Sequence, residues 1–260
     1  MFSLKNLFTK KSHFTEAPEA YWAKIPLGID PKGKKVYWDA TYDAHMGIIG
    51  GSGTGKTNLM ETILTHCVKN GDKIRVVGID MYKNEMQDSE RYSPVVLGVA
   101  TTAGNALKTL EFAREYMMKN YEEMEKAGVN HHLDLEDSPK LLLVMIDEFS
   151  TVLRKYGDAD DAIKDEIKAR LVELVRLGRA AGVQVVLSSQ QMDTDIIPEE
   201  IWNTISSHVS MGGYERSAPG RGSITVKWES PVEFQSYRAD LKTLDEDFAA
   251  IKASPSSDEK

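Results

Sequence analysis

The chain is 260 residues long, enough for one sizeable α/β domain with short additions. Its residues are 41% apolar and 28% charged, and no apolar run approaches the roughly 20 residues that cross a bilayer. The first apolar stretch is too interrupted for a signal peptide, so we expect a cytoplasmic protein without a membrane span. The net charge of −8 argues against nonspecific coating of nucleic acid, although a channel with a few well-placed lysines and arginines is compatible with it.

A disulfide and a cysteine- or histidine-based metal site have little support in the sequence. Cys67 is the only cysteine, which excludes an internal disulfide and a thiolate metal cluster, and we expect it to be a buried structural thiol. His131 and His132 are adjacent in a polar segment that lacks metal-ligand spacing. A loop without metal is therefore the favoured interpretation there, with a metal site as the alternative.

The predicted elements begin after residues 1–24, a flexible segment for which a weak amphipathic surface helix is the alternative. Residues 25–39 predict two short strands around a turn, because Pro31 and Gly33 supply turn chemistry and Val36 to Trp38 favour a strand.

From Met46 onward, short apolar runs alternate with amphipathic helical patterns. In chain order, we predict the strand 46–49, the helix 57–69, the strand 74–79, the helix 104–126, the strand 141–146, the helix 161–179, and the strands 183–187 and 208–211. Near-continuous apolar strands that alternate with helices are typical of a mostly parallel sheet covered on both faces.

The pattern changes beyond Gly213. Residues 223–228 and 232–237 predict a pair of edge strands, which forms a short β extension at the C-terminal end of the domain. Residues 241–260 are acidic and serine-rich, and we expect a partly disordered tail. The ordered domain is thus predicted to span residues 25–240.

A glycine-rich loop follows the strand 46–49. Its sequence, GGSGTGKT, satisfies the phosphate-loop pattern G-x-x-x-x-G-K-[ST] and opens an apolar-striped helix, as the mechanism requires. Lys56 should reach the β- and γ-phosphates of ATP, and the Thr57 hydroxyl should bind Mg²⁺. We expect ATP to contact Gly50, Gly51, Ser52, Gly53, Thr54, Gly55, Lys56, Thr57 and Asn58. An accidental lysine in a glycine-rich turn is the alternative.

An acidic pair follows the most apolar strand of the chain. Asp147 ends the run LLLVMI, where an aspartate can hold Mg²⁺ in the manner of a Walker B element. Glu148 is placed to act as the general base that polarises the attacking water. Because two adjacent carboxylates repel each other, a cation between them and the phosphates is expected. A solvated pair at a strand end is the alternative.

This pair also separates classes of P-loop protein. The chain has no N-K-x-D guanine motif, as a GTPase would, and no L-S-G-G-Q signature, as an ABC transporter would. A glutamate directly after the aspartate favours the additional-strand ATPases, whose fold is RecA-like.

Several segments together resemble the FtsK/SpoIIIE branch of the FtsK–HerA superfamily, over residues 25–238. They are IPLGIDPKG from Ile25, AHMGIIG from Ala44, Asp80 with Lys83 and Glu85, EYMMKNY from Glu115, and GRAAGVQVVLSSQ from Gly178. The order and spacing of these segments make the resemblance specific. It covers most of the chain.

The resemblance implies a homo-oligomeric ring, expected to be a hexamer, that moves double-stranded DNA through its channel. It implies that Gln190 is a sensor of the γ-phosphate or water, with a solvent-facing strand end as the alternative. Arg179 becomes a candidate arginine finger for the neighbouring subunit, and Arg176 competes for that role. A helix-end arginine that binds carbonyls is the alternative for either.

The chain also departs from the family pattern. Gln191 stands where the family usually has arginine, and the sequence carries no membrane region before the motor and no winged-helix module after it. We therefore expect a minimal motor of a plasmid, phage or other mobile element, loaded by a partner protein. The candidate channel segments lie near Lys83, at 156–161 and at 215–221, where Arg216 and Arg221 could touch phosphates or simply flank a hairpin connection.

Two other functions remain open at this point. A secretion ATPase of the EccC kind would act on a polypeptide, but such chains carry several ATPase modules. A slow nucleotide-dependent switch is the third hypothesis, and the presence of Glu148 argues against it.

Overall fold

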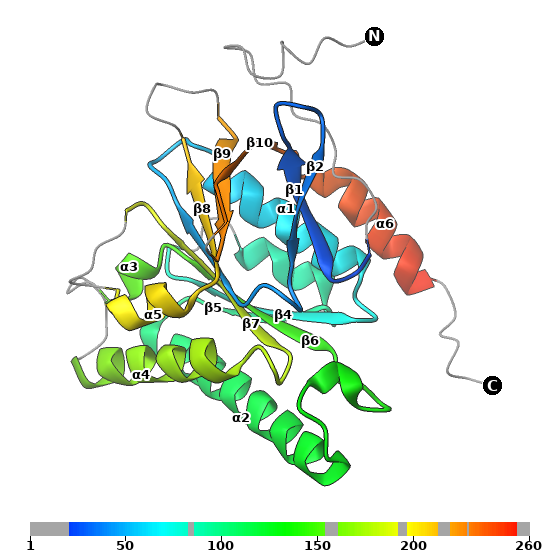
Figure 1. The fold of residues 1–260 in the computed structure, drawn as a ribbon, viewed down its shortest axis with the longest axis vertical. Helices are drawn as coiled ribbons and strands as arrows, with labels where there is room; N and C mark the ends of the chain where they lie inside the picture. Colours follow the sequence, from blue (N-terminus) through cyan, green and yellow to red (C-terminus); the bar gives the residue numbers. More distant parts are fainter. Residues whose placement is uncertain are drawn as a thin grey trace.

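The computed structural model describes residues 21–82, 86–153, 161–191, 197–212, 219–227 and 229–253, without the side chains of residues 152 and 250–253. Within these residues the strands form one ten-stranded sheet in the order β2-β1-β10-β9-β8-β3-β7-β6-β4-β5. Helices cover both faces of this sheet (Figure 1). The α/β fold with a mostly parallel central sheet is confirmed.

The parallel part of the sheet consists of the apolar strands predicted from the sequence together with one more. These strands are β3 (Met46–Ile49), β4 (Ile74–Asp80), β5 (Val96–Ala100), β6 (Leu141–Asp147), β7 (Val183–Ser189) and β8 (Ser207–Met211). All pairings among them are parallel. The strands read as apolar runs because helices exclude water from both faces.

An antiparallel extension continues the sheet beyond β8. It consists of β9 (Arg221–Val226), β10 (Val232–Ser236), β1 (Lys24–Ile29) and β2 (Lys35–Asp39). β9 and β10 pair with each other as predicted, but they are not edge strands, because β9 also pairs with β8 and β10 also pairs with β1. The N-terminal hairpin β1–β2 covers the edge that β10 would otherwise expose.

One layer of helices lies on each face of the sheet. Helices α1 (Lys56–Lys69) and α6 (Leu241–Ala253) pack on one core cluster. Helices α2 (Ala103–Ala127) and α4 (Asp161–Leu177) pack on the other, which includes Leu142 and Val144 of β6. β6 therefore contributes alternate side chains to both cores, as a central strand should.

The structure adds elements that the sequence pattern did not predict. These are β5, α6, and the short helices η2 (Gln87–Tyr92), η3 (His132–Asp134), α3 (Phe149–Leu153) and α5 (Glu199–Thr204). Helix α4 ends at Leu177, two residues before the predicted end, and Gly178 begins the turn into β7.

Helix α6 occupies the segment expected to be an acidic tail. Its acidic residues face outward, whereas Leu244 and Phe248 are buried against the core. The Phe248 ring packs edge-on against Tyr92 at 5.4 Å between centroids, and the Tyr92 hydroxyl donates to Asp245 at 2.7 Å. Tertiary packing thus stabilises a helix whose composition suggested disorder.

Candidate nucleotide site

The glycine-rich loop connects the end of β3 to the start of α1. Gly53 and Gly55 have φ of 76° and 104°, a left-handed region that residues with a Cβ adopt only at a cost. Gly55 is the N-cap of α1, where no side chain caps the first turn and no acidic residue occupies it. The first amides of α1 are therefore available to an anion at the positive end of the helix dipole.

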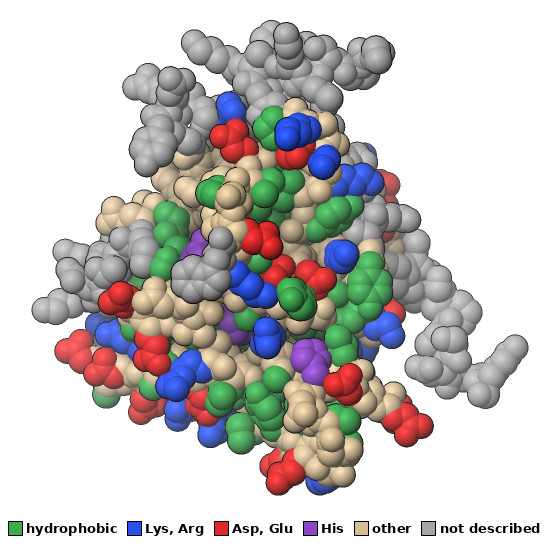
Figure 2. Space-filling view, in the orientation of Figure 1, with side chains coloured by type: hydrophobic (Ala, Val, Ile, Leu, Met, Phe, Trp, Pro, Cys, Tyr) green, Lys and Arg blue, Asp and Glu red, His purple; other side chains and the backbone are tan. Residues whose placement is uncertain are grey.

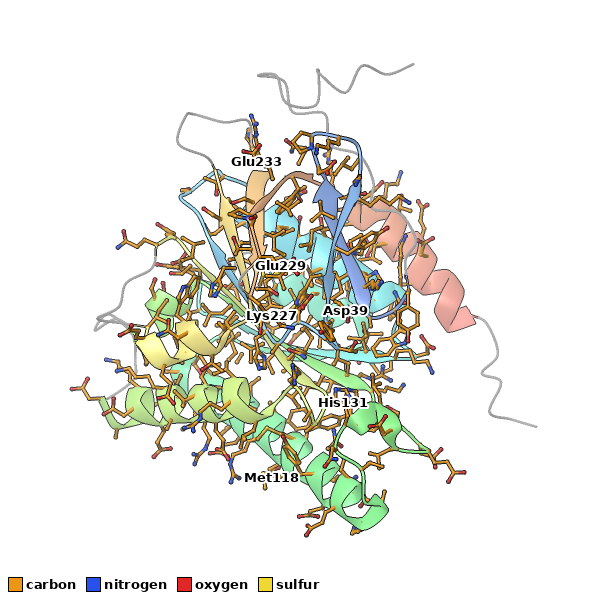
Figure 3. The ribbon with its side chains drawn as sticks, viewed as in Figure 1. Asp39, Met118, His131, Lys227, Glu229 and Glu233 are labelled. Carbon is orange, nitrogen blue, oxygen red and sulfur yellow. The ribbon has the colours of Figure 1, made fainter. Side chains whose placement is uncertain are left out.

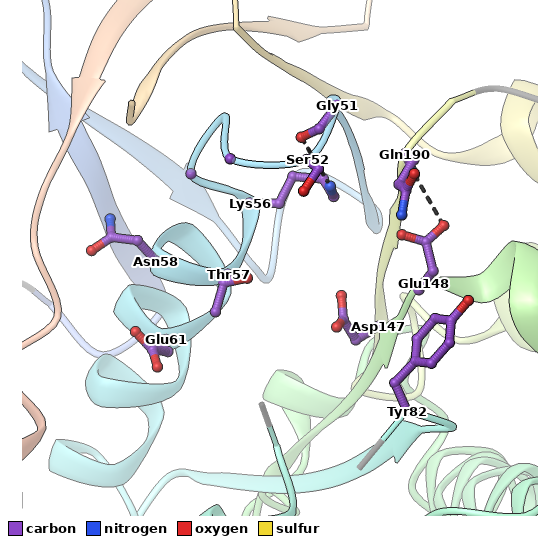
Figure 4. Close-up of a pocket in the computed structure, with 12 residues that line it drawn as sticks. Gly51, Ser52, Lys56, Thr57, Asn58, Glu61, Tyr82, Asp147, Glu148 and Gln190 are labelled. Carbon is purple, nitrogen blue, oxygen red and sulfur yellow. Dashed lines mark hydrogen bonds between the residues drawn. The ribbon is translucent and has the colours of Figure 1, made fainter. Parts of the chain in front are cut away.

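Two side chains shape this loop. The Lys56 ammonium donates to the carbonyl oxygens of Gly50 at 2.7 Å and Gly51 at 3.4 Å, so it lies over the loop (Figure 4). The Thr54 hydroxyl donates to the Gly51 carbonyl at 2.8 Å. The lysine is held above the amides that would surround a phosphate, as the motif predicts.

A pocket of about 570 Å³ opens between the loop and the ends of β4, β6 and β7. It is lined by Gly51, Ser52, Gly53, Gly55, Lys56, Thr57, Asn58, Glu61, Tyr82, Asp147, Glu148 and Gln190. Every residue expected to contact ATP is among them except Gly50 and Thr54, which instead hold the shape of the loop. The loop and the acidic pair therefore share one pocket.

Asp147 ends β6 beside the buried Asp80, its partner across the parallel register with β4. Burial is the main cause of a raised pKa of Asp147, and the charges of Asp80 and Glu148 raise it further. A hydrogen bond from the Ser188 hydroxyl and the charge of Lys56 act in the opposite direction. This concentration of negative charge favours a bound cation.

Glu148 follows with a φ of 47°, unusual for a residue with a side chain. The turn keeps its side chain buried while it faces the pocket. Its Oε1 accepts a hydrogen bond from the Gln190 main-chain N–H at 3.1 Å and another from the Ser150 hydroxyl at 2.9 Å (Figure 4). Both donors bind the same oxygen, which leaves Oε2 as the candidate proton acceptor.

Strand β7 lies between the strand that leads into the phosphate loop and the strand that carries the acids. This is the inserted strand that the adjacent Asp147–Glu148 pair led us to expect. Its end contacts both neighbours, since the Ser189 carbonyl accepts from the Gly50 N–H at 3.2 Å and the Gln190 N–H reaches Glu148. The additional-strand arrangement is confirmed.

Gln190 lines the pocket with an exposed side chain, a position consistent with its predicted role as a sensor. Arg179 lies elsewhere, exposed in the turn that leads into β7, and its charge acts on His45 and His131. Figure 3 shows His131 by the connection that enters β6, away from the phosphate loop. Arg179 therefore does not reach the pocket of its own chain.

The competing arginine is engaged in an ion pair. Arg176 contacts the Glu200 carboxylate at 3.2 Å, with both side chains more than half exposed. Such an exposed pair contributes little to stability, so it does not exclude another role. The geometry leaves the choice between the two arginines a prediction.

Asn58 lines the pocket, but its side chain binds the last residue of β10 and the residue after it. Its amide nitrogen donates to the Tyr237 carbonyl at 2.6 Å and to the Ser236 hydroxyl at 3.1 Å. This asparagine thereby joins the first turn of α1 to the antiparallel extension. The structure thus shows a bracing role that the motif did not predict.

Sequence reasoning missed several residues of the site. Asp80 was noted only for its resemblance to a family segment, yet it is buried and accepts from the N–H groups of Tyr82 and Met86, both at 3.1 Å. Ser150 and Ser188 bind the acids, and Tyr82 and Glu61 line the pocket. An aspartate that ends a buried strand was the available signal for Asp80.

Mg²⁺ with ATP fits this pocket on the chemistry of its donors. The uncapped amides of α1 and the Lys56 ammonium match a polyphosphate. The Thr57 hydroxyl and the Asp147 carboxylate are hard oxygen ligands of the kind that Mg²⁺ prefers. The raised pKa of Asp147 means that a nearby cation would be stabilising.

Cys67 is buried, as expected, and burial raises the pKa of its thiol to about 12. In the described segments no cluster of three or more possible metal-binding side chains occurs, and no helix there has the length and apolarity to cross a membrane. Lys83, residues 156–160 and Arg216, expected near a channel, lie outside the described residues.

A comparison with family models matches residues 14–199 to the FtsK/SpoIIIE family. The chain belongs to the FtsK/SpoIIIE family. Similar proteins of this family include the FtsK domain-containing protein YdcQ of Bacillus subtilis, 29% identical over 80% of this chain, and the DNA translocase FtsK of Tropheryma whipplei, 23% identical over 74%. The chain matches 46% of the length of YdcQ and 27% of that translocase, so it spans less than half of these relatives.

Solved structures support the same fold. The conjugation coupling protein TcpA of pCW3, determined as a monomer with ATPγS, superposes with a TM-score of 0.77 at 18% identity, over 91% of this chain and 74% of that one. EssC (ATPases 2 and 3) of Geobacillus thermodenitrificans superposes with a TM-score of 0.74 at 16% identity, over 94% of this chain and 51% of that one. At these identities the likeness shows the FtsK/SpoIIIE-type fold alone.

Proposed function

We propose that this FtsK/SpoIIIE-family chain is the ATP-hydrolysing part of a ring motor that translocates double-stranded DNA. One observation carries the hydrolytic part of the proposal: the phosphate loop and the Asp147–Glu148 pair face a single pocket, joined by the end of β7. ATP and Mg²⁺ are the proposed cofactors, and the cytoplasm is the proposed location.

The proposed mechanism assigns a role to five side chains of the pocket. Lys56 and the amides of the loop bind the β- and γ-phosphates, while Thr57 and Asp147 hold Mg²⁺. Bound Mg²⁺ neutralises charge on the phosphate oxygens. Glu148 orients the attacking water and accepts its proton at Oε2, because Oε1 is occupied by two donors. Gln190, beside Glu148, is the proposed sensor.

The DNA part of the proposal rests on the names of relatives. The Tropheryma whipplei protein is named a DNA translocase, and TcpA is titled a conjugation coupling protein. Figure 2 shows Lys and Arg interspersed with Asp and Glu over α4, without a broad basic surface on that face. Duplex contact is proposed for the channel segments near Lys83, 156–161 and 215–221, where Arg221 is ion-paired with Glu233 at 3.5 Å.

The assembly is proposed to be a homo-oligomeric ring, as a hexamer, in which Arg179 completes the neighbour's site. An exposed arginine far from its own pocket is suited to act in trans. In rings mixed with Arg179→Ala subunits, activity should fall more steeply than the mutant fraction, whereas Arg176→Ala subunits should leave activity near that of the parent. A proportional loss with Arg179→Ala, measured by ATP hydrolysis, would reject this role.

A three-way measurement of ATP hydrolysis tests the proposed cargo. Turnover should rise strongly with duplex DNA, and less with single-stranded DNA, over the rate without cargo. Equal rates in all three conditions would instead favour a secretion ATPase that acts on polypeptide, like EccC, or a slow switch. A mobile-element role and a recruiting partner protein belong to the same proposal.

A further inference from the structure

Ser188 lies at the point where β7 passes between the phosphate-loop strand and the strand of the acids. It is fully buried and pairs in register with Ile48 of β3. On the other side, Leu187 pairs with Ile146, so the next residues along these parallel strands, Ser188 and Asp147, lie beside each other. The serine hydroxyl therefore contacts the acidic pair from the neighbouring strand β7.

This hydroxyl makes one contact with each acidic residue. Its hydrogen is donated to Oδ1 of Asp147. Its oxygen accepts a hydrogen bond from the main-chain N–H of Glu148 at 3.2 Å. A hydroxyl has a single hydrogen, so donation to Asp147 leaves its lone pairs for the Glu148 N–H, and the two bonds support each other.

Each contact holds one of the two acids in the orientation that the proposed hydrolysis requires. The bond to Oδ1 restricts rotation of the Asp147 carboxylate and leaves Oδ2 for the metal shell. The bond from Glu148 satisfies a buried N–H of a residue with a φ of 47°, a backbone conformation that persists only when its surroundings hold it. Ser188 thus contributes to the orientation of both acids at once.

We propose that Ser188 is a positioning residue that aligns Asp147 for Mg²⁺ and Glu148 for water, an inference that rests on the proposed ATPase function. Alanine at this position removes the donor and leaves the Glu148 N–H without its partner, with little change in volume. Threonine keeps the hydroxyl. The pair of variants therefore separates the hydrogen bonds from packing.

The test measures equilibrium binding of a fluorescent ATP analogue in EDTA and in Mg²⁺, for the parent, Ser188→Ala and Ser188→Thr. Ser207→Ala is the matched control, because Ser207 is a buried serine on β8 outside this pocket. In EDTA, the affinities of all four proteins for the ATP analogue should agree within about twofold. The increase in affinity on adding Mg²⁺ should be about tenfold smaller in Ser188→Ala than in the parent. Ser188→Thr and Ser207→Ala should keep the gain.

A second readout addresses Glu148. At saturating Mg²⁺ and ATP, kcat of Ser188→Ala should remain reduced, because added metal cannot restore the bond to the Glu148 N–H. If Ser188→Ala keeps the full Mg²⁺-dependent gain in nucleotide affinity and an unchanged kcat, the positioning role of Ser188 is overturned and the proposed ATPase function is not. If Ser188→Thr loses as much of the Mg²⁺-dependent gain in affinity as Ser188→Ala, the positioning role of Ser188 is also overturned. A parent whose nucleotide binding ignores Mg²⁺ would overturn the proposed function and this inference with it.

Discussion

Lys56 and Glu148 belong to different elements of one pocket, so their substitutions should separate nucleotide binding from hydrolysis. Lys56→Ala removes a charged donor to the phosphates and should weaken ATP binding by about 2 kcal/mol, roughly 30-fold. Glu148→Gln keeps an oxygen for the Gln190 N–H but cannot take up a proton, so binding should persist while turnover falls about 100-fold or more. Parent-like turnover in either variant, measured at saturating Mg²⁺, would refute its assigned role.

His45 should make the free energy of unfolding depend on pH. Burial is the main cause that lowers its pKa to about 4 from the ordinary 6.5, and the charge of Arg179 adds to this. Between pH 4 and pH 6.5 the unfolded chain binds more protons at this residue than the folded chain. The contribution of neutral His45 to stability is therefore fully present above pH 6.5 and is lost as the pH falls toward 4. The expected loss between pH 7 and pH 5 is about 2 kcal/mol from this residue.

Chemical denaturation at pH 7 and pH 5 checks this expectation. His45 has a φ of 59°, which asparagine tolerates, so His45→Asn is the suitable variant. It removes the titrating ring and fills this buried site less completely, so its stability at pH 7 should fall. Between pH 7 and pH 5, the free energy of unfolding of this variant should nevertheless fall by less than that of the parent. An equal fall would contradict the assignment of the pH dependence to His45.

At the same scale, residue patterns predicted Lys56, Thr57, Asp147 and Glu148 because each belongs to a motif with defined spacing. Ser188 could not be found this way. A serine on an apolar strand has no spacing rule, and its role depends on which strand becomes the neighbour of β6. Only the strand order places it beside Asp147.

At the scale of elements, the phosphate loop is braced by the antiparallel extension. The Gly220 N–H donates to the Thr54 carbonyl at 2.8 Å, and the Gly220 carbonyl accepts from the Ser236 N–H at 2.7 Å. A Cβ added to Gly55 would lie 2.6 Å from the Gly220 nitrogen, whereas one added to Gly53 would meet nothing within 4 Å. The two glycines therefore differ in what surrounds them, although both have positive φ.

Alanine substitutions at these glycines should separate backbone strain from collision. Gly53→Ala should destabilise the loop conformation by about 1 kcal/mol, because alanine is unfavourable in the left-handed backbone region. Gly55→Ala adds a clash with backbone that must move, so its nucleotide affinity should fall well below that of Gly53→Ala. Equilibrium binding of an ATP analogue to both variants checks the order, and equal affinities would show that the brace does not constrain the loop.

Element types were predictable where periodicity was strong, and not elsewhere. The long helices and the buried strands follow directly from their apolar spacing. β5, VLGVA, has a glycine at its centre that interrupts the apolar run, so its pattern did not indicate a strand. Helix α6 depends on contacts of Phe248 and Asp245 with Tyr92 and Arg91, more than 150 residues away in sequence, which local composition does not reveal.

At the scale of the whole molecule, the sheet order explains how the site is assembled. The phosphate loop, the acids and Gln190 come from strands adjacent only in space, because β7 inserts between β3 and β6. The adjacent Asp147 and Glu148 favoured the additional-strand class of ATPase, but they did not identify which strand is inserted. The placement of the hairpin β1–β2 beside β10 was not predictable, since antiparallel pairing across more than 200 residues has no sequence signature.

Triplex displacement is the most direct test of the proposed coupling between ATP hydrolysis and movement along duplex DNA. A third DNA strand is annealed to a site on linear duplex DNA, and its release by the protein is measured with ATP and Mg²⁺. If the proposal holds, the parent releases the third strand in an ATP-dependent manner, whereas Glu148→Gln, which should still bind ATP, releases none. A parent that hydrolyses ATP in the presence of the duplex yet leaves the third strand bound would contradict it.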